Sequence, residues 1–123
     1  VLFKAFSFRE AAQAIKLAGY DGLEISAIQG MCEHLNLDDW KAQKADLLDV
    51  MAEVGLTFLS TEVASLDKER LKKAFEACAE IGIPVINVGP GGKSGDEETL
   101  RASVETLADL FTAVVSFPLA EEP

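Results

Sequence analysis

Three phrases along the chain share one pattern: an amphipathic helical stretch, a glycine and then a run of apolar, strand-favouring residues. They occupy positions 18–26 (AGYDGLEIS), 54–63 (VGLTFLSTEV) and 81–89 (IGIPVINVG). The glycines Gly19, Gly55 and Gly82 stand where a helix ends in a left-handed residue, and the hydrophobic residue after each is expected to pack on the last turn. The pattern therefore predicts helices that alternate with strands.

Polar residues with the spacing of helix caps precede four amphipathic stretches. Two pairs match the capping box, in which each side chain satisfies the other residue's backbone N–H: Ser7 with Glu10, and Ser94 with Glu97. The caps expected for the two middle helices are Asn36, and Ser65 or Asp67. The core-facing stripe expected in the fourth helix consists of Leu100, Val104, Leu107 and Leu110.

The strand phrases are continuous apolar runs more than strict alternations. Strands buried on both faces have this pattern, which indicates a parallel sheet covered by helices and an α/β fold. No linker or change in composition divides the chain before about residue 111, so residues 1–123 are interpreted as one structural unit. In 111–123 the glycine turn is missing, and the run 114–117 fits either a strand or a continued helix that Pro118 would end.

The charge balance disfavours some classes of partner. The formal net charge is −10, from 21 acidic and 11 basic residues, and this disfavours nucleic acid, which usually requires a basic face. No apolar run approaches the ~20 residues of a membrane-spanning helix, so no membrane association is expected. Cys32 and Cys78 fit no zinc or disulfide spacing, and a reducing cytoplasm is the expected compartment.

The opening stretch 2–26, LFKAFSFREAAQAIKLAGYDGLEIS, resembles the start of the xylose isomerase-like TIM barrels, the sugar phosphate isomerase/epimerase superfamily. There a first strand leads into S-F-x-E-A, a helix, and G-Y-D-G-hydrophobic-E. The matching residues are Ser7, Phe8, Glu10, Ala11, Gly19, Tyr20, Asp21, Gly22 and Glu24. The later phrases EVGL and EIGIPVINVG resemble that family's entries into strands three and four, so the likeness covers about residues 1–110.

The resemblance implies a partial (β/α)8 TIM barrel of about four βα units with parallel strands. This chain would be its N-terminal portion, from helix one to helix four or strand five. An open doubly wound sheet is the alternative that fits the length, since a closed barrel needs ~250 residues. Half a barrel would expose strand edges and helix faces, which would favour a homo-oligomer.

In a barrel, functional side chains gather on the loops that follow the strands. Here those loops supply four candidate substrate-binding residues: His34, Glu62, Asn87 and Lys93. His34, the sole histidine, can act near neutral pH or can be an ordinary surface residue. Glu62 can bind a sugar hydroxyl or a metal, or can be a solvated acid. Glu24 lies within a strand, where a buried carboxylate needs a partner, and a structural role is favoured.

The stretch 87–95, NVGPGGKSG, has the order of a phosphate-binding loop: a strand, glycines, Lys-Ser and a helix. It departs from the P-loop GxxxxGK[ST], because Asn87 stands at the first glycine and Pro90 lacks a backbone donor. A phosphate- or hydroxyl-binding loop and a simple flexible connection remain open.

The leading functional prediction is a fragment of a metal-dependent sugar or sugar-phosphate isomerase/epimerase that is inactive alone. The resemblance implies Mn²⁺, Mg²⁺ or Co²⁺ in the whole enzyme, held by carboxylates and a histidine from strands five to eight, and no bound metal in this fragment. The ending LAEEP resembles the family's strand-five phrase, which would make Glu122 a metal ligand. The alternatives are a small acidic α/β domain that binds an anion or a protein, and an endonuclease IV-type nuclease, which one histidine and the charge disfavour.

Overall fold

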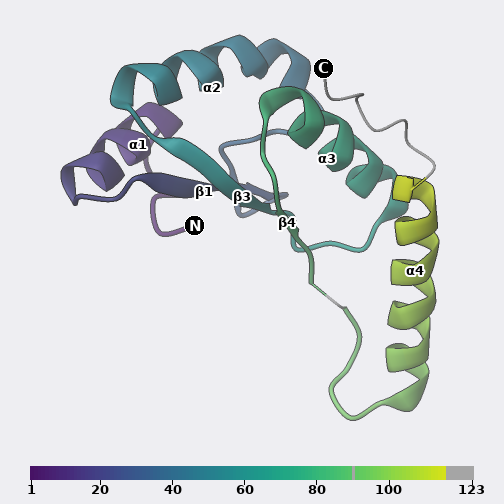
Figure 1. Cartoon of the computed structure of the whole chain (residues 1–123). Coiled ribbons are helices and arrows are strands. Elements are labelled where there is room, and N and C mark those ends of the chain that lie inside the picture. Colours follow the sequence, from purple (N-terminus) through teal and green to yellow (C-terminus); the bar gives the residue numbers. More distant parts are fainter. Residues whose placement is uncertain (90, 116–123) are drawn as a thin grey trace.

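Helices and strands alternate along the chain in a computed structural model that describes residues 1–89 and 91–115 (Figure 1). The elements are α1 (Phe8–Leu17), β1 (Gly22–Ile28), β2 (Cys32–Glu33), α2 (Trp40–Val54), β3 (Thr57–Glu62), α3 (Lys68–Ile81), β4 (Ile86–Asn87) and α4 (Glu97–Val115). The fold is α/β, as predicted. The short strand β2 was not predicted, and Glu122 lies outside the described residues.

Glycine ends the first three helices at the predicted positions. Gly19, Gly55 and Gly82 have φ angles of 95°, 80° and 89°, the left-handed values that favour glycine over residues with a Cβ. The following Leu56 and Ile83 are buried, which confirms the predicted packing on the last turn. The same prediction is wrong for the first helix, because Tyr20 is 65% exposed.

Two of the four predicted caps have the expected contacts. Ser7 and Glu10 form the capping box at α1, and the Asp67 side chain accepts the N–H of Arg70 at the start of α3. The Asn36 side chain accepts the N–H of Asp38 in a turn that precedes α2, so it does not cap that helix itself.

The capping box predicted for the fourth helix is wrong. The helix begins at Glu97, and the Asp96 carboxylate accepts the N–H groups of Glu98 and Thr99. Asp96 lies immediately before the first helical residue and so can reach these donors, which is the geometry of an N-cap.

The strands form one sheet in the order β2-β1-β3-β4. β1 pairs with β3 and β3 with β4 in parallel, as predicted, whereas β2 folds back on β1 as an antiparallel strand. α1, α2 and α3 lie over one face of this sheet (Figure 1). Ile25, Phe58, Leu71 and Val50 belong to the core between these layers.

α4 extends away from the other helices (Figure 1). Of its predicted core stripe only Leu110 is buried, while Leu100, Val104 and Leu107 are 64%, 57% and 39% exposed. Asp109, which precedes Leu110, forms an ion pair with Lys68 of α3, and its Oδ2 atom accepts a hydrogen bond from the Lys68 Nζ atom at 2.7 Å. The helix is therefore attached through its C-terminal half, and most of its apolar stripe lacks a covering element among the described residues.

Candidate functional site

The sheet face that α1, α2 and α3 leave uncovered carries a polar cluster drawn from three strands. Glu24 of β1, Ser60 of β3 and Asn87 of β4 meet there. The Glu24 Oε2 atom accepts hydrogen bonds from the Ser60 hydroxyl and from the Asn87 Nδ2 group, each at 2.6 Å. We call these three residues the Glu24 cluster.

An irregularity in the strand register places Ser60 beside Glu24. Leu23 pairs with Phe58 but Glu24 pairs with Ser60, so Leu59 is the extra residue of a bulge. A Cβ at Gly22 would lie 2.7 Å from the Leu59 side chain, which shows that Leu59 packs directly over this glycine. The bulge thus turns Leu59 toward the start of β1 and aligns the Ser60 hydroxyl with the carboxylate.

Exposed apolar side chains lie close to the Glu24 cluster in the sequence. Leu59 of β3, which precedes Ser60, and Val85, which lies just before β4, are 54% and 49% exposed. Such side chains suit contact with further protein, whereas the polar cluster suits a polar ligand.

Glu62 lies beside the Glu24 cluster but points into its own turn. It is the register partner of Asn87, and its Oε1 atom accepts the N–H of Ala64 at 3.1 Å. Ala64 has a φ of 53°, a left-handed value that is uncommon outside glycine. The carboxylate therefore stabilises the turn that leaves β3.

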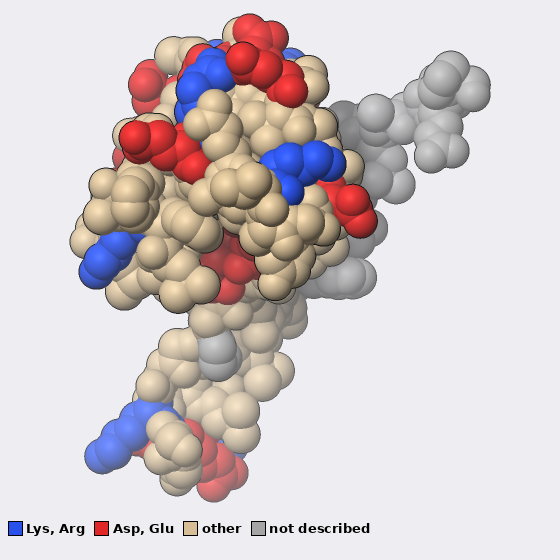
Figure 2. Space-filling model, turned by 90° about the vertical axis from the view of Figure 1, so that its left-hand side faces the viewer, with Lys and Arg blue, Asp and Glu red and all other residues tan. Residues whose placement is uncertain are grey.

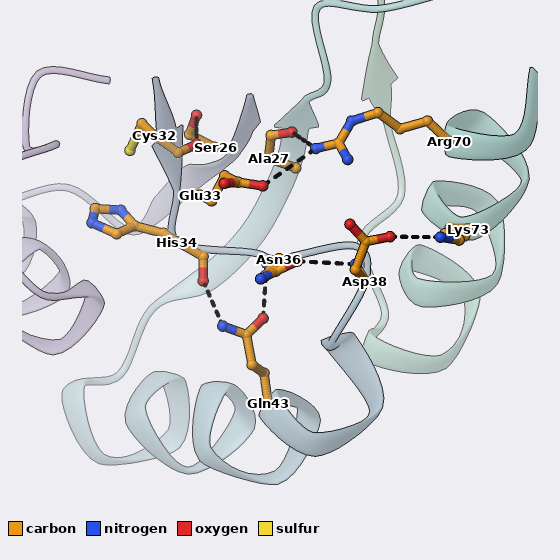
Figure 3. A network of polar contacts seen from close by, with 10 residues as sticks. All are labelled: Ser26, Ala27, Cys32, Glu33, His34, Asn36, Asp38, Gln43, Arg70 and Lys73. Carbon is orange, nitrogen blue, oxygen red and sulfur yellow. Dashed lines mark hydrogen bonds and ion pairs between the residues drawn. The ribbon is translucent and has the colours of Figure 1, made fainter. Parts of the chain in front are cut away.

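His34 belongs to a separate network around the β1–β2 hairpin. Its Nε2 atom lies 2.8 Å from the carbonyl oxygen of Phe6, and its ring packs against Phe8. Figure 3 shows the ring turned away from Glu33 and Arg70. The imidazole thus holds the N-terminal segment against the hairpin.

Arg70 crosses from α3 to the hairpin (Figure 3). It is buried, its Nη2 atom donates to the carbonyl of Ala27 at 2.8 Å, and the same atom lies 3.7 Å from the Glu33 carboxylate. Its Nε atom is buried without a hydrogen-bond partner in the part of the chain that the structure describes. The guanidinium fixes the hairpin on α3, a role that no local sequence pattern predicts.

Lys93 lies in the loop before α4, which lines a hollow of about 620 Å³. The Lys93 N–H donates to the Thr99 hydroxyl at 3.0 Å, and Asp96 occupies the first free donors of the helix. Figure 2 shows the lobe that this region forms below the body of the molecule, with acidic and basic side chains side by side. The backbone donors that a phosphate would need are thus partly used by the loop itself.

The four predicted site residues do not form one contact network. Within residues 1–89 and 91–115, no hydrogen bond or ion pair joins any two of His34, Glu62, Asn87 and Lys93. Asn87 instead binds Glu24. The predicted need of this carboxylate for a partner is met, but its predicted burial is wrong, because Glu24 is exposed on the uncovered face of the sheet. Ser60 was not predicted as a site residue, because a serine within a strand carries no functional signal until the register of the strand is known.

Two further findings concern metal binding and membranes. Within the described residues, no three His, Cys, Asp or Glu side chains lie close enough to hold a metal ion. Nor does that part of the chain include a helix long and apolar enough to cross a membrane.

Comparison with protein-family models finds no match, and no curated protein matches the sequence.

Proposed function

We propose that this chain forms part of a (β/α)8 barrel related to the xylose isomerase-like sugar and sugar-phosphate isomerases and epimerases, and that it supplies one wall of the carbohydrate site. The observation that carries the proposal is the Glu24 cluster. It is a polar group built from three strands on the sheet face opposite the helices, where the interior of a barrel would lie.

The strand order is the one that a barrel requires, and one half of a doubly wound sheet shares it. β1, β3 and β4 are neighbours in the order in which they occur, and α2 and α3, which connect them, lie on the same face. A doubly wound sheet reverses direction and places helices on both faces, whereas a barrel adds each strand on the same side. β2 pairs with only the last two residues of β1, so the edge of β1 along its earlier residues stays open for another strand.

The wall can bind and orient a carbohydrate but cannot carry out the reaction. Carboxylate and amide groups are common hydrogen-bonding partners of sugar hydroxyls, and Glu24 is held in place by two short bonds. No three His, Cys, Asp or Glu side chains of the described residues are grouped to hold a divalent metal. A metal and the acid–base groups of the isomerase would come from other strands of the barrel.

The test is binding and turnover measured on the same sample. We would titrate the isotope-labelled chain with aldoses, ketoses and their phosphates in one sample with Mn²⁺ and in a parallel control with Mg²⁺, which does not cause paramagnetic relaxation. In the same samples we would follow exchange of the substrate C2 proton in D₂O. We expect saturable carbohydrate binding without exchange. Failure of every carbohydrate to bind would contradict the proposal, and exchange catalysed by this chain would contradict its inactivity.

Anion binding by a small non-enzymatic domain is the second candidate. One observation favours it: the hollow before α4 is lined by Lys93, Ser94 and three glycines. Asp96 and Glu97 line the same hollow, however, and their negative charge opposes an anion. Inorganic phosphate that shifts only the amide signals of this loop, with no carbohydrate binding, would favour this candidate over the barrel wall.

A further inference from the structure

We propose that the Glu24 cluster selects the hydroxyl-bearing end of a neutral carbohydrate and rejects the phosphate of a sugar phosphate. This inference rests on the proposed function and names the part of the substrate that this wall contacts.

The first argument is which atoms remain free. Ser60 and Asn87 both donate to the Glu24 Oε2 atom, which fixes the carboxylate plane and uses one of the two Asn87 amide hydrogens. The Glu24 Oε1 atom and the Asn87 Oδ1 atom accept no hydrogen bond from the described part of the chain. Both are acceptors, so a ligand that binds them must donate hydrogen bonds.

The second argument is charge. No hydrogen bond or ion pair of the described residues joins a lysine or arginine to Glu24, Glu62 or Asn87. Glu62 adds a second carboxylate beside the cluster, because it is the register partner of Asn87. A phosphate group offers acceptors and negative charge, so two carboxylates would repel it with no paired cation beside them to offset that repulsion.

The third argument is the fixed geometry of the acceptors. Glu24 and Asn87 come from β1 and β4, which are separated by β3, and their side chains meet across it. Neighbouring hydroxyls of a sugar or polyol can donate to two such acceptors at once. Because the protein hydrogen bonds already orient the carboxylate, less side-chain freedom is lost when the ligand binds.

The experiment compares three probes on the labelled full chain: D-xylose, inorganic phosphate and methylammonium. We expect xylose to shift the amide signals of Glu24, Ser60 and Asn87, and phosphate to leave them unchanged. Glu24→Gln should weaken xylose binding by about tenfold or more, since a charge-assisted hydrogen bond becomes a neutral one. Asn87→Ala should weaken it as well, whereas the matched control Glu105→Gln, an exposed acid on α4, should not.

The outcomes separate this inference from the function on which it rests. Three results would overturn the selectivity for hydroxyls and leave the carbohydrate function standing. They are signal shifts at the cluster on addition of phosphate, tighter binding of methylammonium than of xylose, and xylose-induced shifts confined to other residues. If Glu24→Gln retains the native fold by circular dichroism and binds xylose unchanged, the cluster is not the contact. If xylose and all other carbohydrates fail to bind, both proposals fall.

Discussion

Replacement of Arg70 by methionine tests how the β1–β2 hairpin is held. Methionine keeps much of the apolar stem of arginine but removes the donor to Ala27 and the charge near Glu33. The carbonyl of Ala27 would lose a partner at 2.8 Å. We therefore expect Arg70→Met to lower the free energy of unfolding and to loosen the hairpin relative to α3.

The magnitude follows from opposing contributions. Loss of a hydrogen bond from a charged donor costs about 1.5–3 kcal/mol. The ion pair adds at most about 1 kcal/mol, because the Glu33 side chain is 34% exposed and solvent screens it. Arg70→Met also removes a buried charge and the unpartnered Nε atom, both of which destabilise the folded state, and this offsets part of the loss of stability. The net expectation is a loss of about 1–2 kcal/mol.

The assay is denaturant unfolding followed by the fluorescence of Trp40, the sole tryptophan, which is buried in the core. The matched control is Lys72→Met on the same helix, whose exposed pair with Glu69 should contribute less than about 0.5 kcal/mol. A stability for Arg70→Met equal to or above that of the parent chain would refute the reasoning, because the cost of burying the charge would then exceed its hydrogen bonds. Amide exchange in β2 gives an independent measure of the hairpin.

Three further predictions concern other parts of the chain. Burial raises the pKa of the Cys78 thiol to about 12, so at pH 8 it should resist a thiol reagent until the protein unfolds; rapid labelling of the native chain would contradict this. The backbone N–H and hydroxyl of Ser7 lower the pKa of Glu10, so the stability that this carboxylate contributes should be complete above its unfolded pKa and lost as the pH falls through the lower folded pKa. In Ser7→Ala this acid dependence, read from melting temperatures, should weaken, and an unchanged dependence would contradict the role of the hydroxyl. Gly82→Ala should cost about 1 kcal/mol in denaturant unfolding from its φ of 89° alone, since a Cβ there meets nothing within 4 Å, and an unchanged midpoint would argue against the left-handed turn.

The boundaries of α1 and α3 were predictable because their signals are local. A capping box needs only residues three apart, and a left-handed glycine needs only the last helical turn, so Ser7 and Gly82 could be assigned from neighbouring residues. Asp67 was one of two candidate caps, with Ser65, and the structure decides for Asp67. The cap of α4 was missed because Asp96 and Ser94 are both acceptable caps, and the choice between them depends on the path of the loop.

The apolar stripe of α4 shows the limit of periodicity. The spacing of Leu100, Val104, Leu107 and Leu110 predicts an amphipathic helix, and a helix forms there. The same spacing gives no information on which partner covers the stripe, and in the described chain only Leu110 is buried.

The sequence by itself determined the order of the four helices and of β1, β3 and β4, the parallel pairing of these strands and the presence of a carboxylate inside β1. Periodicity, caps and glycine turns act over a few residues, and so they can be read along the chain. Only the tertiary structure decided that Glu24 binds Ser60 and Asn87, that Arg70 reaches the hairpin and that His34 and Lys93 lie in other networks. The contacts of Glu24 with Ser60 and Asn87, and of Arg70 with Ala27, join residues 36 to 63 positions apart. Those of Glu24 depend on strand register and one bulge, which no local pattern specifies.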